Sequence, residues 1–233
     1  MFLAMDTVFD QCSIAILDGS GKTVTCLTET GKRMQTQQIL PMIDAALAES
    51  QLSLADMQAL IFNRGPGAFS GIRINTAVVQ ALSVAHDLPC VGVSSLQAIA
   101  QCAYQQYGLA QVYSALDARM QQVYFGHYEL KNDSGFSSAI MQPVDMENGD
   151  DTERLLDYER QTSLNIPIVG NGAGLLSLHE GQIGYDAVWP DAVIIGLLGI
   201  AQFMTTGGTD AAHALPKYLR NQAWKTLKEQ GKA

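Results

Sequence analysis

Residues 63–89 read Asn-Arg-Gly-Pro-Gly-Ala-Phe-Ser-Gly-Ile-Arg-Ile-Asn-Thr-Ala-Val-Val-Gln-Ala-Leu-Ser-Val-Ala-His-Asp-Leu-Pro. The apolar run 57–62 before them has the length of a β-strand, and the Gly-Pro-Gly at 65–67 interrupts regular structure. Ser70 is a residue type that caps helices, and a helix starting there ends before Pro89. This pattern predicts a strand, a glycine-rich turn and a helix. The apolar side chains on one face of that helix are Ile74, Val78, Ala81 and Ala85.

The glycine-rich turn has two possible roles. Free backbone N–H groups at the positive end of a helix suit an anion, but a tight turn can also do no more than join two elements. A P-loop is excluded because Gly65 and Gly71 are one residue too far apart, and a dinucleotide fingerprint would need a glycine at Ser70. The loop is therefore either structural or close to a nucleotide. Its candidate residues are Arg64, Gly65, Pro66, Gly67, Gly71 and Arg73.

Composition narrows the classes of function. The chain has 233 residues and a formal charge of −9, which argues against broad nucleic-acid binding by this chain alone. Its four cysteines form no Cys-x-x-Cys pair and lie in apolar contexts, which predicts buried thiols in a reducing compartment. The start of the chain lacks the basic region of a signal peptide, and glycines and Gln202 interrupt the uncharged stretch 192–209. We therefore expect a soluble cytoplasmic protein without a membrane span.

The chain opens with a pattern that returns later. An apolar strand at 2–6 ends in Asp6, and a polar turn and an alternating strand follow. The same order recurs at 111–116, which is followed by Asp117, a polar turn and another strand. Alternating helices and strands complete each part. This repeat predicts an α/β fold made of two similar halves, residues 1–109 and 110–233.

The two aspartates that end the repeated strands are the best candidates for chemistry. An aspartate at a strand end, beside free N–H groups, can hold a metal–phosphate or orient water, and it can equally cap its own turn. The sequence leaves both possibilities open. With their neighbours, the candidates for a cleft are Asp6, Thr7, Asp117 and Arg119. A metal site is not expected, because no two of the four histidines are three or four residues apart.

Six motifs carry a resemblance to a known family. They are Leu3-Ala-Met-Asp-Thr, Gln37-Gln-Ile-Leu-Pro-Met, Arg64-Gly-Pro-Gly-Ala-Phe-Ser-Gly-Ile-Arg-Ile, Val91-Gly-Val-Ser-Ser-Leu, Leu116-Asp-Ala-Arg with Val123-Tyr, and Tyr218-Leu-Arg-Asn. With these motifs, most of the chain resembles the bacterial TsaB (YeaZ) family. The resemblance implies the fold shared by actin, sugar kinases and Hsp70 chaperones. It also implies a non-catalytic subunit required by TsaD, the enzyme that places a threonylcarbamoyl group on the adenosine beside the tRNA anticodon.

Partners and cofactors follow from the same resemblance. The ATPase TsaE joins the complex, tRNA is met only through it, and the chain alone is expected to form a homodimer. TsaD holds a metal with His-x-x-x-His, whereas this chain has Ser95 and Ile99 there, so no resident cofactor is expected. ATP or ADP at the partner interface is left open. Helices 35–50 and 70–86 carry more small and apolar residues than one buried face needs. The partner-interface candidates are Gln35, Met42, Ala45, Ala77, Val79 and Leu82.

The chain departs from the family pattern at a few positions. Gln35 stands where many members have a histidine, Ala68 and Ser70 replace a serine and a threonine, and Asn75 replaces a glycine. These changes put a direct role of a helix-one histidine or a loop hydroxyl in doubt. Two other functions remain as alternatives. One is an autonomous kinase or ATPase of the same fold, and the other is a peptidase, for which the sequence has no nucleophile signature.

Overall fold

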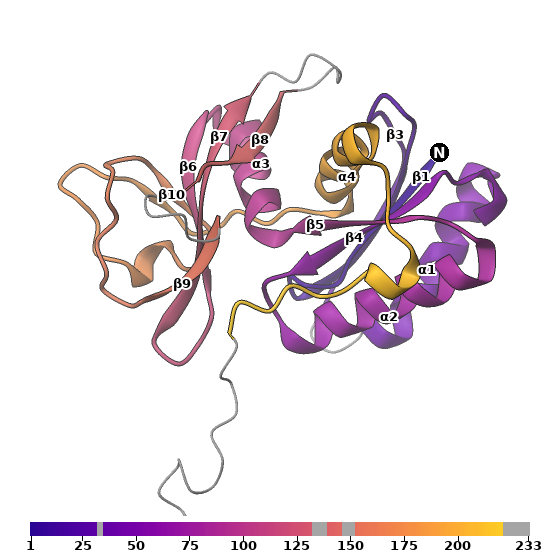
Figure 1. Ribbon diagram of the computed structural model, residues 1–233, viewed down its shortest axis with the longest axis horizontal. Helices are drawn as coiled ribbons and strands as arrows, with labels where there is room; N and C mark the ends of the chain where they lie inside the picture. Colours follow the sequence, from indigo (N-terminus) through magenta and orange to yellow (C-terminus); the bar gives the residue numbers. More distant parts are fainter. Residues whose placement is uncertain (32–34, 132–138, 146–151, 221–233) are drawn as a thin grey trace, which may run out of the picture.

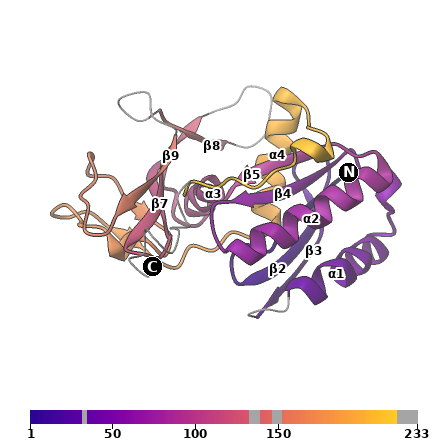
Figure 2. The same ribbon diagram turned by 60° about the horizontal axis from the view of Figure 1, so that its bottom comes forward.

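The computed structural model describes residues 1–31, 35–131, 139–145 and 152–220. The described chain forms two α/β halves, each built on one mixed sheet (Figure 1). A second view shows the two halves side by side, with α1 and α2 packed together on the outside of the first half (Figure 2). The predicted α/β architecture is therefore confirmed.

The first half is built on a five-stranded sheet in the order β3-β2-β1-β4-β5. Its first three strands pair antiparallel and form a meander, whereas β1, β4 and β5 are parallel. The strands are β1 (Phe2–Asp6), β2 (Gln11–Leu17), β3 (Thr23–Thr30), β4 (Ala59–Gly65) and β5 (Cys90–Ser94).

Helices cover both faces of this sheet. On one face lie α1 (Gln35–Ser50) and α2 (Phe69–His86), which pack on alternate residues of β1 such as Leu3 and Met5. On the other face lies α4 (Ala192–Thr206), which packs on the β1 residues that point to the opposite side, Phe2 and Ala4. Because both of its faces are buried, β1 is an unbroken apolar run up to Asp6.

The second half is built on a six-stranded sheet. Its main path is β11-β10-β6-β7-β8, and β9 pairs with another stretch of β7. The strands are β6 (Gln111–Asp117), β7 (Gln122–Lys131), β8 (Ile140–Pro143), β9 (Glu153–Asp157), β10 (Ile168–Val169) and β11 (Gly184–Tyr185). Three short 3₁₀ turns complete the described elements, η1 (Leu54–Asp56), η2 (Ala173–Leu175) and η3 (Ala211–His213).

Two helices pack on the sheet of the other half, relative to the boundary predicted between residues 109 and 110. Helix α3 (Ser95–Tyr107) precedes the boundary but packs on β6, β7 and β8 of the second sheet. Helix α4 follows the boundary but packs on the first sheet. One apolar core, with residues of α3, α4 and both sheets, joins the halves. The boundary itself stays a prediction.

Helix α2 is rotated relative to the prediction. Ala81 and Ala85 are exposed and Ser70 does not cap the helix, since Ala68 is at the N-cap position with no side-chain bond. The buried face includes polar residues. Asn75 is fully buried, and its Nδ2 is compensated there by donating to the carbonyls of Met5 (3.2 Å) and Asn63 (3.0 Å). The predicted face was therefore right at Ile74 and Val78, which are half-buried against the core, and wrong at Ala81 and Ala85.

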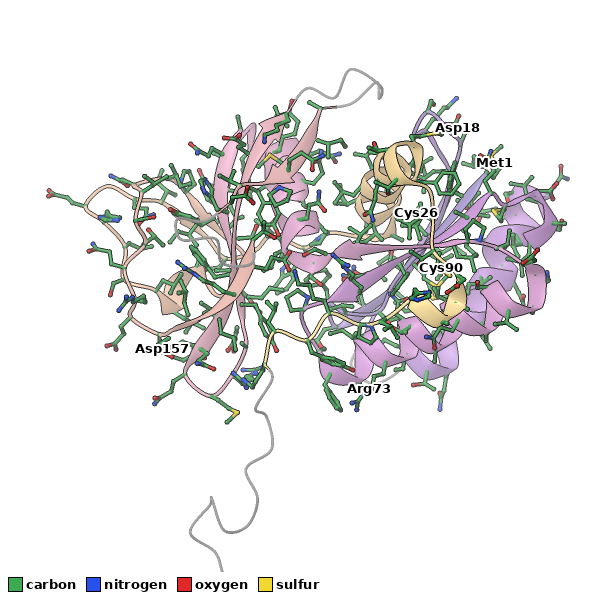
Figure 3. The ribbon with its side chains drawn as sticks, in the orientation of Figure 1. Met1, Asp18, Cys26, Arg73, Cys90 and Asp157 are labelled. Atoms are coloured by element: carbon green, nitrogen blue, oxygen red, sulfur yellow. The ribbon has the colours of Figure 1, made fainter. Side chains whose placement is uncertain are left out.

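Two further expectations concern burial. Cys12, Cys90 and Cys102 are buried as predicted, but Cys26 is exposed on the edge strand β3 (Figure 3). Helix α4, within the uncharged stretch, is largely buried. Among the described residues, no helix has both the length and the apolar composition needed to cross a bilayer.

Candidate functional site: a cleft between the two halves

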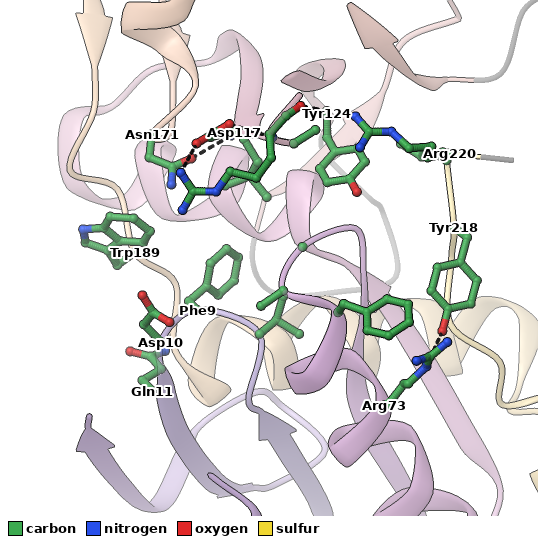
Figure 4. Close-up of a pocket in the computed structure, with 18 of the residues that line it drawn as sticks. Phe9, Asp10, Gln11, Arg73, Asp117, Tyr124, Asn171, Trp189, Tyr218 and Arg220 are labelled. Carbon is green, nitrogen blue, oxygen red and sulfur yellow. Dashed lines mark hydrogen bonds and ion pairs between the residues drawn. The ribbon is translucent and has the colours of Figure 1, made fainter. Parts of the chain in front are cut away.

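A cleft of about 1030 Å³ separates the two halves (Figure 4). Its floor and walls come from corresponding places in the two sheets: the β1–β2 turn (residues 8–11) and the β6–β7 turn (residues 116–120). Further lining comes from residues 67–69 at the entry to α2, from Trp189 and from residues 218–220, together with Thr30, Arg73, Tyr124 and Asn171. The cleft therefore lies between the two repeat-start turns, and a functional site there stays a prediction.

The two repeat-start aspartates hold their turns in the same way. Asp6 Oδ1 accepts a hydrogen bond from the Val8 amide at 2.9 Å, and Asp117 Oδ1 accepts one from the Arg119 amide at 2.7 Å. This matched i to i+2 bonding is the turn-capping role of aspartate. It also supports the repeat that the sequence predicted.

The surroundings of these two aspartates differ. Asp6 is fully buried beneath the cleft, where its Oδ1 also accepts from Asn63 Nδ2 at 3.0 Å. Asp117 lines the cleft, and its Oδ2 pairs with Arg119 Nη1 at 2.8 Å. Of the four cleft candidates, Asp117 and Arg119 therefore face the cleft, while Asp6 and Thr7 lie under its floor.

Burial decides the protonation of Asp6. Loss of water raises the pKa of its carboxyl from 3.8 to about 7, although hydrogen bonds from the Val8 amide, Asn63 and Gln11 lower it in part. The carboxyl group is thus half-protonated near neutral pH and closed off from any ligand in the cleft.

The glycine-rich turn packs tightly on the β1–β2 turn. A Cβ atom added at Gly71 would lie 2.1 Å from the Thr7 carbonyl oxygen, and one at Gly67 would lie 2.4 Å from Val8 Cγ1. Thr7 Oγ1 also donates to the Gly71 carbonyl at 2.7 Å. These glycines allow close packing between α2 and the strand end. An anion at this turn stays a prediction.

The other residues of the turn separate into two groups. Gly65 and Pro66 are buried, and Arg64 lines a separate, smaller cavity of about 220 Å³. Arg73 lines the cleft, where its guanidinium carbon lies 3.4 Å from the centre of the Phe69 ring and its Nε donates to Tyr218 Oη at 3.2 Å.

Aromatic side chains of the cleft were missed by the sequence analysis. Phe9 and Trp189 meet edge to face with ring centres 6.3 Å apart, and Tyr218 lies opposite Phe69 at 6.4 Å. Trp189 and Tyr218 are both about half exposed. An aromatic residue in an otherwise polar turn, as at Phe9, is the one local signal that could have indicated them.

The partner-interface candidates do not form one surface. Met42 and Val79 are 8% and 0% exposed and belong to the core between α1, α2 and the sheet, which corrects their assignment to an interface. Ala45 and Ala77 are exposed, while Gln35 and Leu82 are half-buried. Among the described residues, no group of three His, Cys, Asp or Glu side chains could hold a metal ion.

Comparison with known proteins places this architecture in a class. Residues 29–223 match the family model described as TsaD, tRNA N6-adenosine threonylcarbamoyltransferase. The match includes parts of both halves, while β1, β2 and the cleft residues 8–11 lie before its start. With the two α/β halves, each on one mixed sheet, this match places the chain in the TsaD-like class of proteins.

Relatives that are similar over nearly the whole chain identify the family within this class. The tRNA threonylcarbamoyladenosine biosynthesis protein TsaB of Escherichia coli K12 is 35% identical over 97% of both chains, and that of Haemophilus influenzae is 32% identical over 97% of this chain and 96% of its own. The solved structure of YeaZ from Pseudomonas aeruginosa has a TM-score of 0.78 at 31% identity and covers 93% of this chain and 99% of its own. The chain belongs to the TsaB (YeaZ) family.

Proposed function

We propose that this chain is a non-catalytic subunit required to form threonylcarbamoyladenosine beside the tRNA anticodon. In this role it binds and activates a TsaD-type transferase, together with a TsaE-type ATPase, and meets tRNA only through the complex. The observation that carries the proposal is a full-length match to relatives named for this biosynthesis.

The proposal that the subunit is non-catalytic is supported at the position of the TsaD metal ligands. Ser95 is fully buried and its Oγ donates to Asn63 Oδ1 at 2.7 Å, while Ile99 is fully buried in the core. The Ser95 side chain ties the start of α3 to β4, and Ile99 packs in the apolar core that joins the two halves. Asp6 is sealed below the cleft, which counts against the alternative of an autonomous kinase with a catalytic aspartate there.

The proposal includes no cofactor held by the isolated chain. A nucleotide at the interface with the partner remains part of it, because Arg119 and Arg73 lie at the cleft surface and suit a phosphate. How the chain activates its partner is also part of the proposal. It binds the active conformation of the transferase more tightly and so shifts the population toward that conformation.

Reconstitution tests this function. Synthase, TsaD, TsaE, ATP, threonine, bicarbonate and tRNA are combined with and without this chain, and modified adenosine is measured by mass spectrometry. We expect modification only when the chain is present, and no ATP turnover by the chain alone. Equal yields in both tubes would refute the subunit role, and ATP turnover by the pure chain would favour the kinase alternative.

We place the partner surface on the exposed side of α1 and α2. On α2, Ala77, Ala81 and Val84 lie at helical spacing and are exposed, with Val84 at 76%, and Leu40 on the adjacent α1 is 51% exposed. Small and apolar residues in the open favour close packing of helices from another chain. In the absence of a partner, the same surface would pair two copies of this chain.

Val84→Glu is expected to abolish co-elution with the transferase, because it would bury an unpaired charge at the interface. The circular dichroism spectrum and melting temperature should stay unchanged, since Val84 is largely exposed. Leu178→Glu, at a 41% exposed position of the second half, is the matched control and should still co-elute. If the Val84 variant binds as well as the control, the interface lies elsewhere.

A further inference from the structure

Residues 214–220 form a strap that starts on the first half and ends on the second (Figure 1). At its start, Ala214 is buried and its carbonyl accepts from Gln80 Nε2 at 3.1 Å. The Lys217 amide then donates to the Arg64 carbonyl at 2.8 Å. These bonds fix the strap to α2 and to the end of β4.

The far end of the strap is bound to the second half. Arg220 Nη2 donates to Gln122 Oε1 at 2.9 Å and to the Arg119 carbonyl at 3.3 Å, and its Nη1 lies 3.0 Å from Met120 Sδ. These are residues of the β6–β7 turn and the start of β7. Tyr218, Leu219 and Arg220 meanwhile line the cleft, so the strap is one of its walls.

A single buried carboxylate joins the strap to both sheets. Glu153 on β9 is 4% exposed, and its Oε1 accepts hydrogen bonds from Tyr128 Oη at 2.5 Å and from Ser94 Oγ. Ser94 ends β5 of the first sheet, whereas Tyr128 belongs to β7 of the second. Glu153 pairs with Gly126 in the sheet register, and this glycine lies against the Tyr128 ring, where a side chain would collide with it.

The remaining oxygen of Glu153 meets the strap. Lys217 Nζ lies 3.1 Å from Oε2, at an angle outside hydrogen-bond geometry, so the contact is an ion pair. Within the described residues, this is the only cation within 4.0 Å of the Glu153 carboxylate. A carboxylate this deeply buried is costly unless a positive charge and donors surround it. Two of the partners of Glu153 are tied to the first half, Ser94 as the end of β5 and Lys217 through its bond to the Arg64 carbonyl.

We propose that the strap is a latch. The Lys217–Glu153 ion pair and the Arg220 contacts hold the two halves at one relative orientation and so set the width of the cleft. Removing either attachment lets the halves rotate and populates further orientations. The inference concerns the chain alone and does not depend on the proposed function.

Distances between spin labels on the two halves test the latch. Cys26 is the exposed one of the four cysteines and lies on β3 of the first half, and Glu180→Cys supplies a second exposed site on the second half. Double electron–electron resonance spectroscopy should give one narrow distribution of label-to-label distances for the labelled parent. Lys217→Met should broaden it or add a second population, whereas Lys217→Arg, which keeps the charge, should leave it narrow.

Three further variants make the test decisive. Lys131→Met removes an exposed lysine 3.6 Å from Glu129 and should leave the distribution unchanged. Arg220→Gln loosens the far end of the strap without touching the core and should broaden the distribution, so it decides the matter if Lys217→Met does not fold. In a Glu153→Gln background the ion pair is already lost. Adding Lys217→Met there should therefore not broaden the distance distribution further. If folded Lys217→Met and Arg220→Gln both match the parent distribution, the strap does not set the orientation.

Discussion

Gly71→Ala is expected to destabilise the protein by about 3 kcal/mol, the upper end of what overpacking a core costs. The added methyl would lie 2.1 Å from the Thr7 carbonyl oxygen and 3.3 Å from Val8 Cα. Both are backbone atoms, so no side-chain rotation can relieve the collision. The start of α2 must then move off the floor of the cleft and lose the bond from Thr7 Oγ1. Since domains are stable by only roughly 5 to 15 kcal/mol, this loss is severe.

Urea unfolding followed by circular dichroism measures this loss. The matched control is Gly31→Ala, because a Cβ atom there meets nothing within 4 Å. We expect the control to stay within about 0.5 kcal/mol of the parent. Equal unfolding midpoints for the two variants would show that α2 does not depend on its close approach to the β1–β2 turn.

The stability of the protein is expected to fall by up to about 4 kcal/mol between pH 4 and pH 8 through Asp6 alone. Its carboxyl has a pKa of about 7 in the folded chain, against 3.8 as the ordinary value. The folded chain therefore binds a proton here more readily than the unfolded chain does. The resulting stabilisation is complete in acid and is lost as the pH rises through 7.

Asp6→Asn should remove this dependence, because the amide keeps an oxygen for the Val8 amide and carries no charge. The free energy of unfolding is measured in urea at pH 4, 5, 6, 7 and 8 for the parent and the variant. Asp18→Asn is the control: hydrogen bonds from Ser20 lower the pKa of this exposed carboxyl, so it titrates below the tested range. A parent slope that survives in the Asp6 variant would contradict the assignment.

Local pattern predicted the framework of the fold well. The strands before Asp6 and Asp117 end at these residues, and the alternating strand predicted after each of them is present as β2 and β7. These features depend on neighbours in sequence, such as alternation, capping residues and turn residues. They are therefore readable without the fold.

What could not be predicted depends on residues far apart in the chain. Asp6 is sealed by Asn63, which lies on another strand, and Trp189 meets Phe9 from the other end of the chain. Val79 and Val84 have the same side chain, yet Val79 is buried in the core and Val84 is exposed to solvent. Only the position of α2 on the sheet distinguishes them, and the buried Asn75 sets that position through two backbone carbonyls.

Helix α3 packs on the second sheet and helix α4 packs on the first. This arrangement determines when the first half can fold during synthesis. The face of the first sheet that carries Phe2, Ala4 and Leu17 is covered by α4, whose Phe203 ring lies 5.3 Å from that of Phe2. A nascent chain ending at residue 109 has made all five strands of that sheet but not this cover. Such a chain carries a bare apolar sheet face, of the kind that chaperones hold and that associates between molecules. The first half therefore cannot complete its fold before the ribosome has passed residue 206, and the two halves mature together.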